Sequence, residues 1–316
     1  MHPFRFHTSI NGILGLREVT EAARRAESIG YAGILIADHL VPKMAAVPLL
    51  TAVAAVTERL RIGTFVLNNG LRHPAVLAHD LATLDVLSGG RLEIGIGAGW
   101  NKPEYLGIGL PFPLVGTRVS ELTEAITVLK GCFGDGPFSF AGTHYTITDY
   151  DGQPKPVQRP HPPLFIGGGG RRVLTLAGRE ADIVGLAPRI NTGGAAVTPD
   201  ARSFTLAAAI EKVSWVRAAA GDRFPSLELN AYPSGGPVIV TNDALTVAAD
   251  RAAALSTLSG VSITRDEVLE SPHIYIGTID QIAEKMEMLR STLGVSSFLI
   301  DDTDELAPLV ERLAGK

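Results

Sequence analysis

The sequence has little of several features that would place it in other classes of protein. Its 316 residues include one cysteine, Cys132, so no internal disulfide can form, and this suits a reducing compartment. No long run of a single charge sign occurs and the formal net charge is -5, whereas nucleic-acid binding usually needs a basic face. We therefore expect a cytoplasmic protein with no nucleic-acid partner.

Long apolar runs are also missing. The longest, residues 47–56, is interrupted by Thr51, whereas a membrane helix needs about 20 apolar residues. Residues 1–7 lack the apolar core of a secretory signal. We expect a soluble protein with no membrane segment, and a content of 46% hydrophobic and 19% charged residues is typical of a globular chain.

The histidines do not stand at metal-ligand spacings, no H-E-x-x-H pattern occurs, and one cysteine cannot build a thiolate site. The G-x-S-x-G elbow of serine hydrolases is missing too. We expect no metal site, and the chemistry then falls to an organic cofactor. The scattered histidines are His7, His73, His79, His144, His161 and His273.

What the sequence does contain is a series of apolar, strand-like segments. The first four begin near residues 4, 33, 61 and 91, at intervals of about 30 residues, which is the length of one strand–helix unit. Others begin near residues 163, 182, 227 and 296. Eight strands that alternate with helical patterns favour a closed (β/α)₈ TIM barrel, as one domain over residues 1–316, over an open α/β sheet.

Apolar residues recur at helical spacing between these strands. Glycine adopts positive φ readily, so Gly30 is expected to end the first helix, and Gly89 and Gly90 the third. Thr278 and Gln281 form a capping box before the final large apolar face. The expected helices cover residues 16–29, 48–56, 74–87 and 117–133, a segment from about residue 171, and residues 201–220 and 241–259.

Residues 134–163 break this rhythm with glycines and prolines around a strand-like stretch, residues 143–148. Long loops in compact folds are usually functional or disordered. We interpret the segment as an inserted hairpin and loop that lies over the mouth of the domain, where it would exclude water from the site.

An acid and an imidazole, Asp38 and His39, directly follow the strand near residue 33. In a parallel barrel this end of the strands carries the catalytic groups, and histidine can transfer protons near neutral pH. Asp38 could instead cap the next segment and leave His39 as a surface residue. Asn68 follows the next strand, and it can either bind a ligand carbonyl or end that strand in a turn.

Glycines follow two further strands. Residues 97–99 leave the backbone bare where a flat ring could lie, and Trp100 is either a stacking wall or ordinary core. This is no dinucleotide fingerprint, because the third glycine would fall at Trp100 and no helix follows directly. Residues 167–172 place four glycines and two arginines before a helix, which predicts a phosphate site, although a flexible loop has the same composition.

Several segments together resemble the bacterial luciferase-like superfamily, and more narrowly its actinobacterial branch that depends on the deazaflavin coenzyme F420. The likeness covers most of residues 1–186 together with residues 277–282, and it is weakest over residues 187–275. The segments that carry it are Ala37-Asp38-His39, residues 71–74, residues 83–91, and residues 97–101 followed by Glu104-Tyr105.

The resemblance implies a (β/α)₈ barrel that binds the cofactor ring at the carboxyl end of its strands, and a non-prolyl cis peptide between Phe65 and Val66. It implies that His39 is the acid–base group. Trp100 stands where sugar-phosphate dehydrogenases of this branch carry a glutamate proton donor. We therefore do not expect such a dehydrogenase, and we expect the proton to come from His39, another pocket group or water. The implied ring-binding residues are Asp38, Phe65, Val66, Asn68, Ala98, Gly99 and Asn101, and the implied phosphate-binding residues are Gly167, Gly168, Gly169, Gly170, Arg171 and Arg172.

These inferences predict an oxidoreductase that transfers hydride from reduced F420 to a C=C or C=N bond of a small organic substrate. His39 would supply the proton, Asp38 would orient His39 or bind the ring, and Trp100 would shape the substrate cavity. Three alternatives stay open: an FMN-dependent monooxygenase on the same barrel, a protein that only binds a flavin, and an open-sheet nicotinamide enzyme. The resemblance also implies a homodimer.

Overall fold

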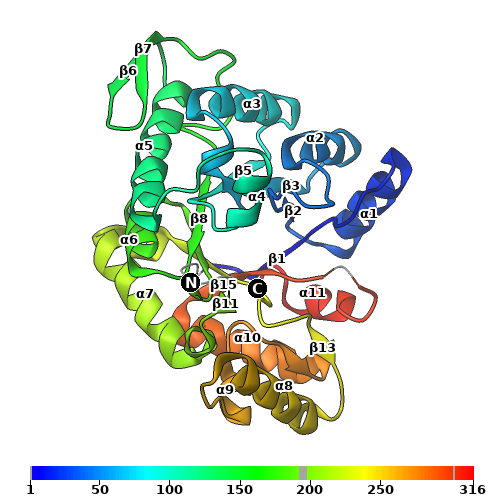
Figure 1. Cartoon of the computed structure of the whole chain (residues 1–316). Coiled ribbons are helices and arrows are strands. Elements are labelled where there is room, and N and C mark those ends of the chain that lie inside the picture. The colour runs from blue at the N-terminus through cyan, green and yellow to red at the C-terminus, as the bar shows by residue number, and fades with distance from the viewer. Residues whose placement is uncertain (1, 192–197, 302) are drawn as a thin grey trace. The chain divides into compact units, whose positions relative to one another are not determined.

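The computed structural model describes residues 2–191, 198–301 and 303–316. Within them, the sheet order β3-β2-β1-β15-β12-β9-β8-β5 returns to its start because β5 also pairs with β3. The predicted (β/α)₈ barrel is therefore confirmed, and every predicted strand is present. Figure 1 labels β1, β2, β3, β5, β8 and β15 among these strands. The eight strands are β1 (Arg5–Thr8), β2 (Gly33–Ile36), β3 (Arg61–Thr64), β5 (Leu92–Gly97), β8 (Leu164–Gly168), β9 (Ile183–Leu186), β12 (Glu228–Ala231) and β15 (Val295–Leu299).

The predicted helices are confirmed, and their ends follow the expected residues. Gly30, Gly89 and Gly90 have φ values of +100°, +67° and +82°. Thr278 and Gln281 form the predicted capping box. The helices are α1 (Leu16–Ile29), α2 (Ala46–Val56), α3 (Pro74–Leu87), α4 (Lys102–Gly107), α5 (Val115–Phe133), α6 (Arg171–Glu180), α7 (Leu206–Ala220), α8 (Ala244–Ser259), α9 (Arg265–Glu270), α10 (Ile279–Leu293) and α11 (Ala307–Leu313), with 3-10 turns η1 (Asn69–Leu71), η2 (Ala201–Phe204) and η3 (Gly221–Ser226).

The chain divides into two compact units. Unit 1 contains Met1–Ser9, Ser28–Ala32 and Gly167–Lys316, and unit 2 contains Ile10–Glu27 and Gly33–Ile166. The assignment of residues 1–316 to a single domain stays a prediction.

Unit 2 holds four parallel strands in register. Leu35 of β2 lies opposite Gly63 of β3, and Gly63 lies opposite Glu93 of β5. Ile96 of β5 lies opposite Ile166 of β8. The short strand β4 (Leu67–Asn68) adds to the far end of β5. Because the strands are parallel and in register, their carboxyl ends meet at one edge, and the residues that follow β2, β4 and β5 lie there together.

Unit 1 holds β9, β12, β15 and β1, again parallel. Asn230 of β12 donates to the Ser297 hydroxyl at 2.9 Å, and Arg5 of β1 forms an ion pair with Glu228 at 2.9 Å. These pairs compensate the burial of the Arg5, Glu228 and Ser297 side chains and of Asn230 Nδ2, whereas Asn230 Oδ1 is buried and has no hydrogen-bond partner among the described residues. Aromatic rings form much of the apolar core, from Phe4, Phe6, Tyr275 and Phe298.

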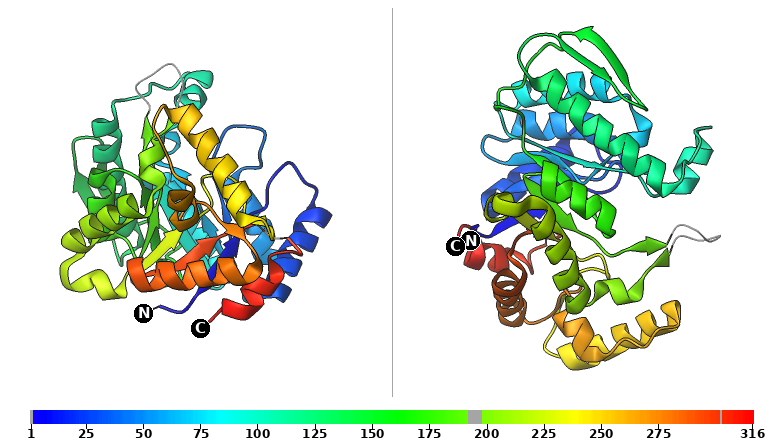
Figure 2. Two further views of the ribbon diagram at one scale, coloured as in Figure 1. Left: turned by 90° about the horizontal axis from the view of Figure 1, so that it is seen from below. Right: turned by 90° about the vertical axis from the view of Figure 1, so that its left-hand side faces the viewer.

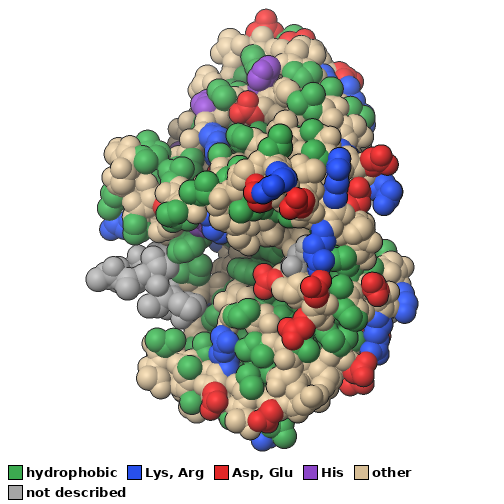
Figure 3. Space-filling model, turned by 90° about the vertical axis from the view of Figure 1, so that its right-hand side faces the viewer, with side chains coloured by type: hydrophobic (Ala, Val, Ile, Leu, Met, Phe, Trp, Pro, Cys, Tyr) green, Lys and Arg blue, Asp and Glu red, His purple; other side chains and the backbone are tan. Residues whose placement is uncertain are grey.

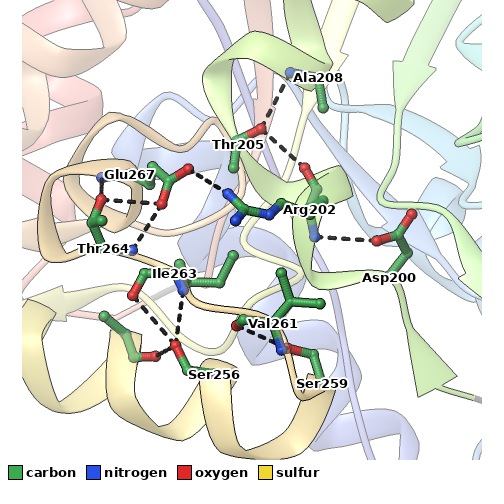
Figure 4. A network of polar contacts seen from close by, with 11 residues as sticks. Asp200, Arg202, Thr205, Ala208, Ser256, Ser259, Val261, Ile263, Thr264 and Glu267 are labelled. Carbon is green, nitrogen blue, oxygen red and sulfur yellow. Dashed lines mark hydrogen bonds and ion pairs between the residues drawn. The ribbon is translucent and has the colours of Figure 1, made fainter.

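A smaller apolar cluster in unit 1 supports α8, which the sequence predicted over residues 241–259. Next to it, Glu267 caps its own helix α9 through Thr264 and forms an ion pair with Arg202 of η2 at 3.0 Å (Figure 4). Short strands β13 (Ile239–Val240) and β14 (Ile276–Gly277) pair beside this cluster. Its buried members are Ala201, Ala248, Ala252, Ile263, Val268, Ile274 and Ile276.

The predicted hairpin is present as the antiparallel strands β6 (Phe138–Ala141) and β7 (Thr146–Tyr150). Figure 2 shows it beside α5, where Glu124 accepts hydrogen bonds from the backbone N–H groups of residues 143–145. The returning loop reaches the opposite end of β5, where Gln158 donates to the Leu92 carbonyl at 2.8 Å. Most of residues 134–163 therefore lie along the outside of α3 and α5 and not over the mouth, contrary to the prediction. At the tip, Tyr145 accepts a hydrogen bond from Asn69, and its ring centroid lies 5.6 Å from that of His73.

Among the described residues, no helix is both long and apolar enough to cross a membrane. On the face shown in Figure 3, acidic and basic side chains are interspersed with apolar ones. A second antiparallel pair, β10 (Ile190–Asn191) and β11 (Thr198–Pro199), completes the elements of unit 1.

Candidate active site

A cis peptide bond joins Phe65 and Val66 directly after β3, as the family resemblance implied. The Phe65 N–H donates to the Ile36 carbonyl at 2.8 Å, which ties this segment to the end of β2. The Phe65 ring packs against Phe165 of β8 with 5.3 Å between ring centroids. The segment therefore lies at the carboxyl ends of β2 and β3 and packs against β8.

The glycines of β5 make room for this segment. A Cβ on Gly95 would lie 1.8 Å from the Thr64 carbonyl oxygen, and one on Gly97 would lie 2.7 Å from a Val66 methyl carbon. We interpreted residues 97–99 as backbone left bare for a cofactor ring. The structure gives these glycines a nearer reason, since residues 64–66 of the chain itself pack on Gly95 and Gly97. The ring-binding role of Ala98 and Gly99 stays a prediction.

Asp38 is buried, with 5% of its surface exposed, and both of its carboxylate oxygens are bonded. Arg72 donates to them from its two terminal nitrogens at 2.6 and 3.0 Å, and the Asn68 N–H donates at 3.0 Å. A bidentate guanidinium–carboxylate pair is among the stronger polar contacts in proteins. Asp38 therefore fixes β4 and η1, and the prediction that it orients His39 was wrong. Its role as a ring ligand stays a prediction.

The side chain of Asn68 lies between two structural partners. Its Oδ1 accepts from the Tyr105 hydroxyl at 2.6 Å and from the Gly70 N–H at 3.1 Å, so Asn68 does end β4 in a turn. Its role as a ring ligand stays a prediction. Burial raises the pKa of Tyr105, although the bond to Asn68 and the charge of Arg118 oppose the rise. Gly99, with φ +75°, packs on the same pair, and its Cβ would lie 2.3 Å from the Tyr105 hydroxyl.

Arg118 of α5 binds the backbone of the loop that follows β5. The side chain is buried, its Nε donates to the Gly99 carbonyl at 3.2 Å, and a terminal nitrogen donates to the Pro113 carbonyl. Its guanidinium lies 4.0 Å from the centroid of the Phe112 ring, an arrangement that stabilises a desolvated cation. The backbone of the loop is therefore fixed by groups of its own unit.

His39 follows β2 at the mouth of unit 2. Its Nδ1 lies 2.8 Å from Oε1 of Glu104 in the first turn of α4, and the same oxygen accepts from Asn101 Nδ2 at 2.6 Å. Trp100 lies edge-on to the imidazole, with 5.5 Å between centroids, and is 40% exposed. An imidazole held on one nitrogen by a carboxylate, and open on the other, is a common acid–base arrangement.

The second glycine-rich segment follows β8. Gly169 packs against the Pro188 carbonyl, where a Cβ would lie 2.5 Å away, whereas nothing lies within 4 Å of a Cβ on Gly170. The helix α6 has no side-chain cap at Gly170 and no acidic residue in its first turn, and Arg171 and Arg172 are exposed. Free N–H groups at the N-terminus of α6, next to the exposed Arg171 and Arg172, can bind an anion.

Four residues of this site escaped prediction as site residues: Arg72, Glu104, Tyr105 and Arg118. Each acts across a long sequence separation, as Glu104 does on His39, 65 residues away. The available signal was the likeness itself, because residues 71–74 and Glu104-Tyr105 are among its segments. Among the described residues, no group of three His, Cys, Asp or Glu side chains could hold a metal ion.

Comparison with known protein families assigns the chain to one of them. The family model of the luciferase-like monooxygenases matches residues 1–203. The chain belongs to this family.

Two relatives found by sequence comparison are named for different cofactors. The FMNH(2)-dependent dimethylsulfone monooxygenase of Pseudomonas putida is 40% identical over 131 residues, which is 42% of this chain and 36% of that protein. The F420-dependent glucose-6-phosphate dehydrogenase of Microbacterium testaceum is 34% identical over 189 residues, 57% of this chain and 55% of that protein. The chain thus matches only about half, or less, of the length of these relatives.

The fold recurs in solved structures. The coenzyme F420-dependent tetrahydromethanopterin reductase of Methanopyrus kandleri superposes with a TM-score of 0.75 at 19% identity, over 99% of this chain and 98% of that chain. At this identity the likeness concerns the fold alone.

Proposed function

We propose that this protein is an oxidoreductase that uses reduced coenzyme F420 to reduce a C=C or C=N bond of a small organic substrate. The observation that carries the proposal is His39, a partly exposed imidazole that a buried carboxylate holds shortly after β2, the strand to which the Phe65 N–H is also hydrogen-bonded. Relatives named as F420-dependent dehydrogenases support the choice of cofactor.

The residues of unit 2 fit a flat redox ring. The Phe65–Val66 segment and the loop of residues 97–101 are both held by backbone and side-chain contacts of the chain, so they offer a preformed surface. We assign Phe65, Val66, Asn68, Ala98, Gly99 and Asn101 to the ring. When bound, reduced F420 supplies a hydride to the substrate.

The start of α6 fits a phosphate group. Gly167–Gly170 keep side chains away from the backbone, and the first turn carries Arg171 and Arg172 with no acid to oppose an anion. We assign these six residues to the phosphate of the cofactor, because helix N-termini bind phosphate through their free N–H groups.

The chain's own contribution to the reaction is proton transfer and positioning. In the reductive direction the substrate gains a hydride on one atom and a proton on its neighbour, and His39 donates that proton from Nε2. Trp100, beside His39 and 40% exposed, shapes the substrate cavity. Holding the substrate within about 3–3.5 Å of the reacting atoms is the main requirement for such a transfer.

Cofactor titration of the apo-protein tests the assignment. F420 and FMN are added separately, and binding is followed by the change in cofactor fluorescence. We expect saturable binding of F420 at micromolar concentration. Micromolar binding of FMN alone would defeat the proposal, and tight binding without turnover of any C=C or C=N substrate would indicate a protein that only stores the cofactor.

The phosphate assignment has a matched control within one helix. Replacing Arg171 and Arg172 with alanine should weaken F420 binding by at least about 10-fold, since each charge-assisted contact contributes about 1.5–3 kcal/mol. Arg179, exposed in the last turn of α6, offers the control Arg179→Ala, which should leave binding unchanged. Equal effects of the two changes would contradict a site at the helix N-terminus.

A second candidate is an FMN-dependent monooxygenase, favoured by the 40% identity to the dimethylsulfone monooxygenase. The two candidates differ in their use of oxygen. A monooxygenase consumes one O₂ for each product molecule, whereas the reductase that we propose turns over at the same rate in an anaerobic chamber.

The homodimer and the cytoplasmic location implied by the sequence stay predictions. Sedimentation velocity of the purified protein measures the first of these directly.

A further inference from the structure

The contact between His39 and Glu104 joins two segments far apart in sequence. His39 follows β2 and keeps 26% of its side chain exposed, whereas the Glu104 side chain is only 4% exposed. The two groups approach through a single pair of atoms, Nδ1 and Oε1, 2.8 Å apart. Within residues 2–191, 198–301 and 303–316 no hydrogen bond to His39 Nε2 occurs. One nitrogen of the imidazole is thus held and the other is available.

Glu104 is itself held in place. Asn101 Nδ2 donates to its Oε1 at 2.6 Å, and the carboxylate lies in the first turn of α4, where a helix favours negative charge. Its second oxygen, Oε2, is buried and has no hydrogen-bond partner among the described residues. A buried carboxylate with an unused oxygen is costly, so a merely structural loop anchor would be expected to satisfy both oxygens.

Trp100 restricts the imidazole from another side. Its ring meets the His39 ring at 74° with centroids 5.5 Å apart. Rotation of the imidazole that would exchange Nδ1 for Nε2 would break the Glu104 contact and disturb this packing. The arrangement therefore selects one ring orientation.

We propose that Glu104 is a positioning residue that keeps the proton of neutral His39 on Nδ1 and presents Nε2 to the substrate. This inference rests on the proposed function, because it assigns His39 to proton transfer. The proton donor is the imidazolium form of His39, which carries a proton on each nitrogen. After Nε2 gives its proton to the substrate, neutral His39 remains with its proton on Nδ1, on the bond to Glu104. Nε2 then takes up one proton from solvent, so that over one turnover the substrate gains one hydride and one solvent proton.

The first test uses apo-protein and needs no cofactor. Nitrogen-15 NMR of the histidine rings distinguishes the two neutral tautomers, and the signals of His39 are those that disappear in His39→Ala. We expect the Nδ1–H tautomer for His39 in the native protein and a mixture of tautomers in Glu104→Gln. An unchanged tautomer in Glu104→Gln would overturn the proposal.

The second test is kinetic. General acid–base groups contribute about 10²–10⁴-fold to rates, so loss of orientation in Glu104→Gln should lower kcat by roughly 10- to 100-fold while KM changes by less than about 3-fold. Glu104→Asp should recover part of kcat, because a carboxylate is kept. A rise in KM with kcat unchanged would contradict the proposal.

Glu93→Gln is the matched control. Glu93 is also a buried carboxylate of unit 2, forms an ion pair with Arg61 at 2.6 Å, and lies near the opposite end of β5. If it lowers kcat as much as Glu104→Gln does, the effect is general loss of stability and the proposal fails. If Glu104→Gln does not fold, Asn101→Ala replaces it, since that change removes the second donor to Oε1 and should broaden the tautomer signal.

The choice of cofactor and the role of Glu104 are tested independently of each other. Binding of FMN instead of F420 would defeat the proposed function, yet the tautomer of His39 in the apo-protein would still show whether Glu104 positions it. Conversely, F420-dependent turnover with an unchanged tautomer would support the function and refute the role of Glu104.

Discussion

Replacing Gly95 with alanine should destabilise unit 2 severely. The new Cβ would lie 1.8 Å from the Thr64 carbonyl oxygen, and real Cβ atoms essentially never approach other atoms within 3.0 Å, so a buried strand must move by about 1 Å or more. Overpacking of this kind costs about 1–3 kcal/mol. The movement also disrupts the two hydrogen bonds between the Thr64 hydroxyl and the Gly95 backbone, at 2.7 and 2.9 Å, each contributing about 1 kcal/mol.

The expected loss is therefore about 4 kcal/mol, a large share of the 5–15 kcal/mol that stabilises a typical protein. Urea unfolding followed by circular dichroism measures it. Gly97→Ala should lose less, about 1–2 kcal/mol, because the atom in its way is a methyl group of Val66 that can move. Gly107→Ala is the control, since nothing lies within 4 Å of its Cβ and alanine favours the helix by about 0.5–1 kcal/mol.

We expect Gly95→Ala to have the lowest urea midpoint of the three variants, followed by Gly97→Ala and then Gly107→Ala. If Gly95→Ala unfolds at the same urea concentration as the native protein, residues 64–66 do not pack on β5 as described. The close contacts of Gly95 and Gly97 with residues 64–66 would then not explain why β5 carries glycine at these two positions.

Asp38→Asn should lower the free energy of unfolding by about 2 kcal/mol, which is less than the 3–5 kcal/mol of a fully buried ion pair because the Arg72 side chain is 28% exposed. Urea unfolding of Asp38→Asn, Arg72→Met and the double variant tests this. If the two losses simply add in the double variant, the two side chains do not interact. Burial would raise the pKa of Glu124, but the three N–H donors of residues 143–145 hold it below its ordinary 4.5. The stability that Glu124 contributes is therefore present above about pH 4.5 and is lost as the pH falls through the lowered pKa. Between about pH 4.5 and pH 3, amide hydrogen exchange at residues 143–145 should become faster relative to the intrinsic exchange rates of an unfolded chain. Glu124→Gln should not show this acceleration. Burial lowers the pKa of Lys212 to about 8, so the native protein should gain stability between about pH 8 and 10 relative to Lys212→Met, and parallel curves would refute this.

The sequence was sufficient for the fold because its signals are local and periodic. Eight apolar segments at strand spacing, and glycines such as Gly30, Gly89 and Gly90 at helix ends, determine where elements begin and end, and all are found. The cis peptide at Phe65–Val66 could not come from periodicity, and only the family resemblance predicted it. The hairpin was predicted, but its position was not, because Glu124 and Gln158 bind it through side-chain contacts that no pattern encodes.

The candidate site was only half predictable for the same reason. His39 and Asp38 stand where strand ends place catalytic groups, so their positions could be read from the chain. Their partners could not, because Glu104 and Arg72 come from other strand–helix units and pair through the fold. Adjacent residues in sequence thus have separate roles, with Asp38 bracing the backbone and His39 facing the mouth.

The β6–β7 hairpin is attached at its tip by Glu124 of α5 and by the hydroxyl of Tyr145, which accepts from Asn69, and at its base by the Phe138 ring, which packs on Gly131 of α5. Such an attachment makes the hairpin a replaceable module for protein engineering. Grafted hairpins that keep the tip and Tyr145 can bring new side chains toward the rim while every barrel strand keeps its native sequence. Libraries aimed at altered selectivity can therefore start at this appendage, outside the tightly packed glycines of β5.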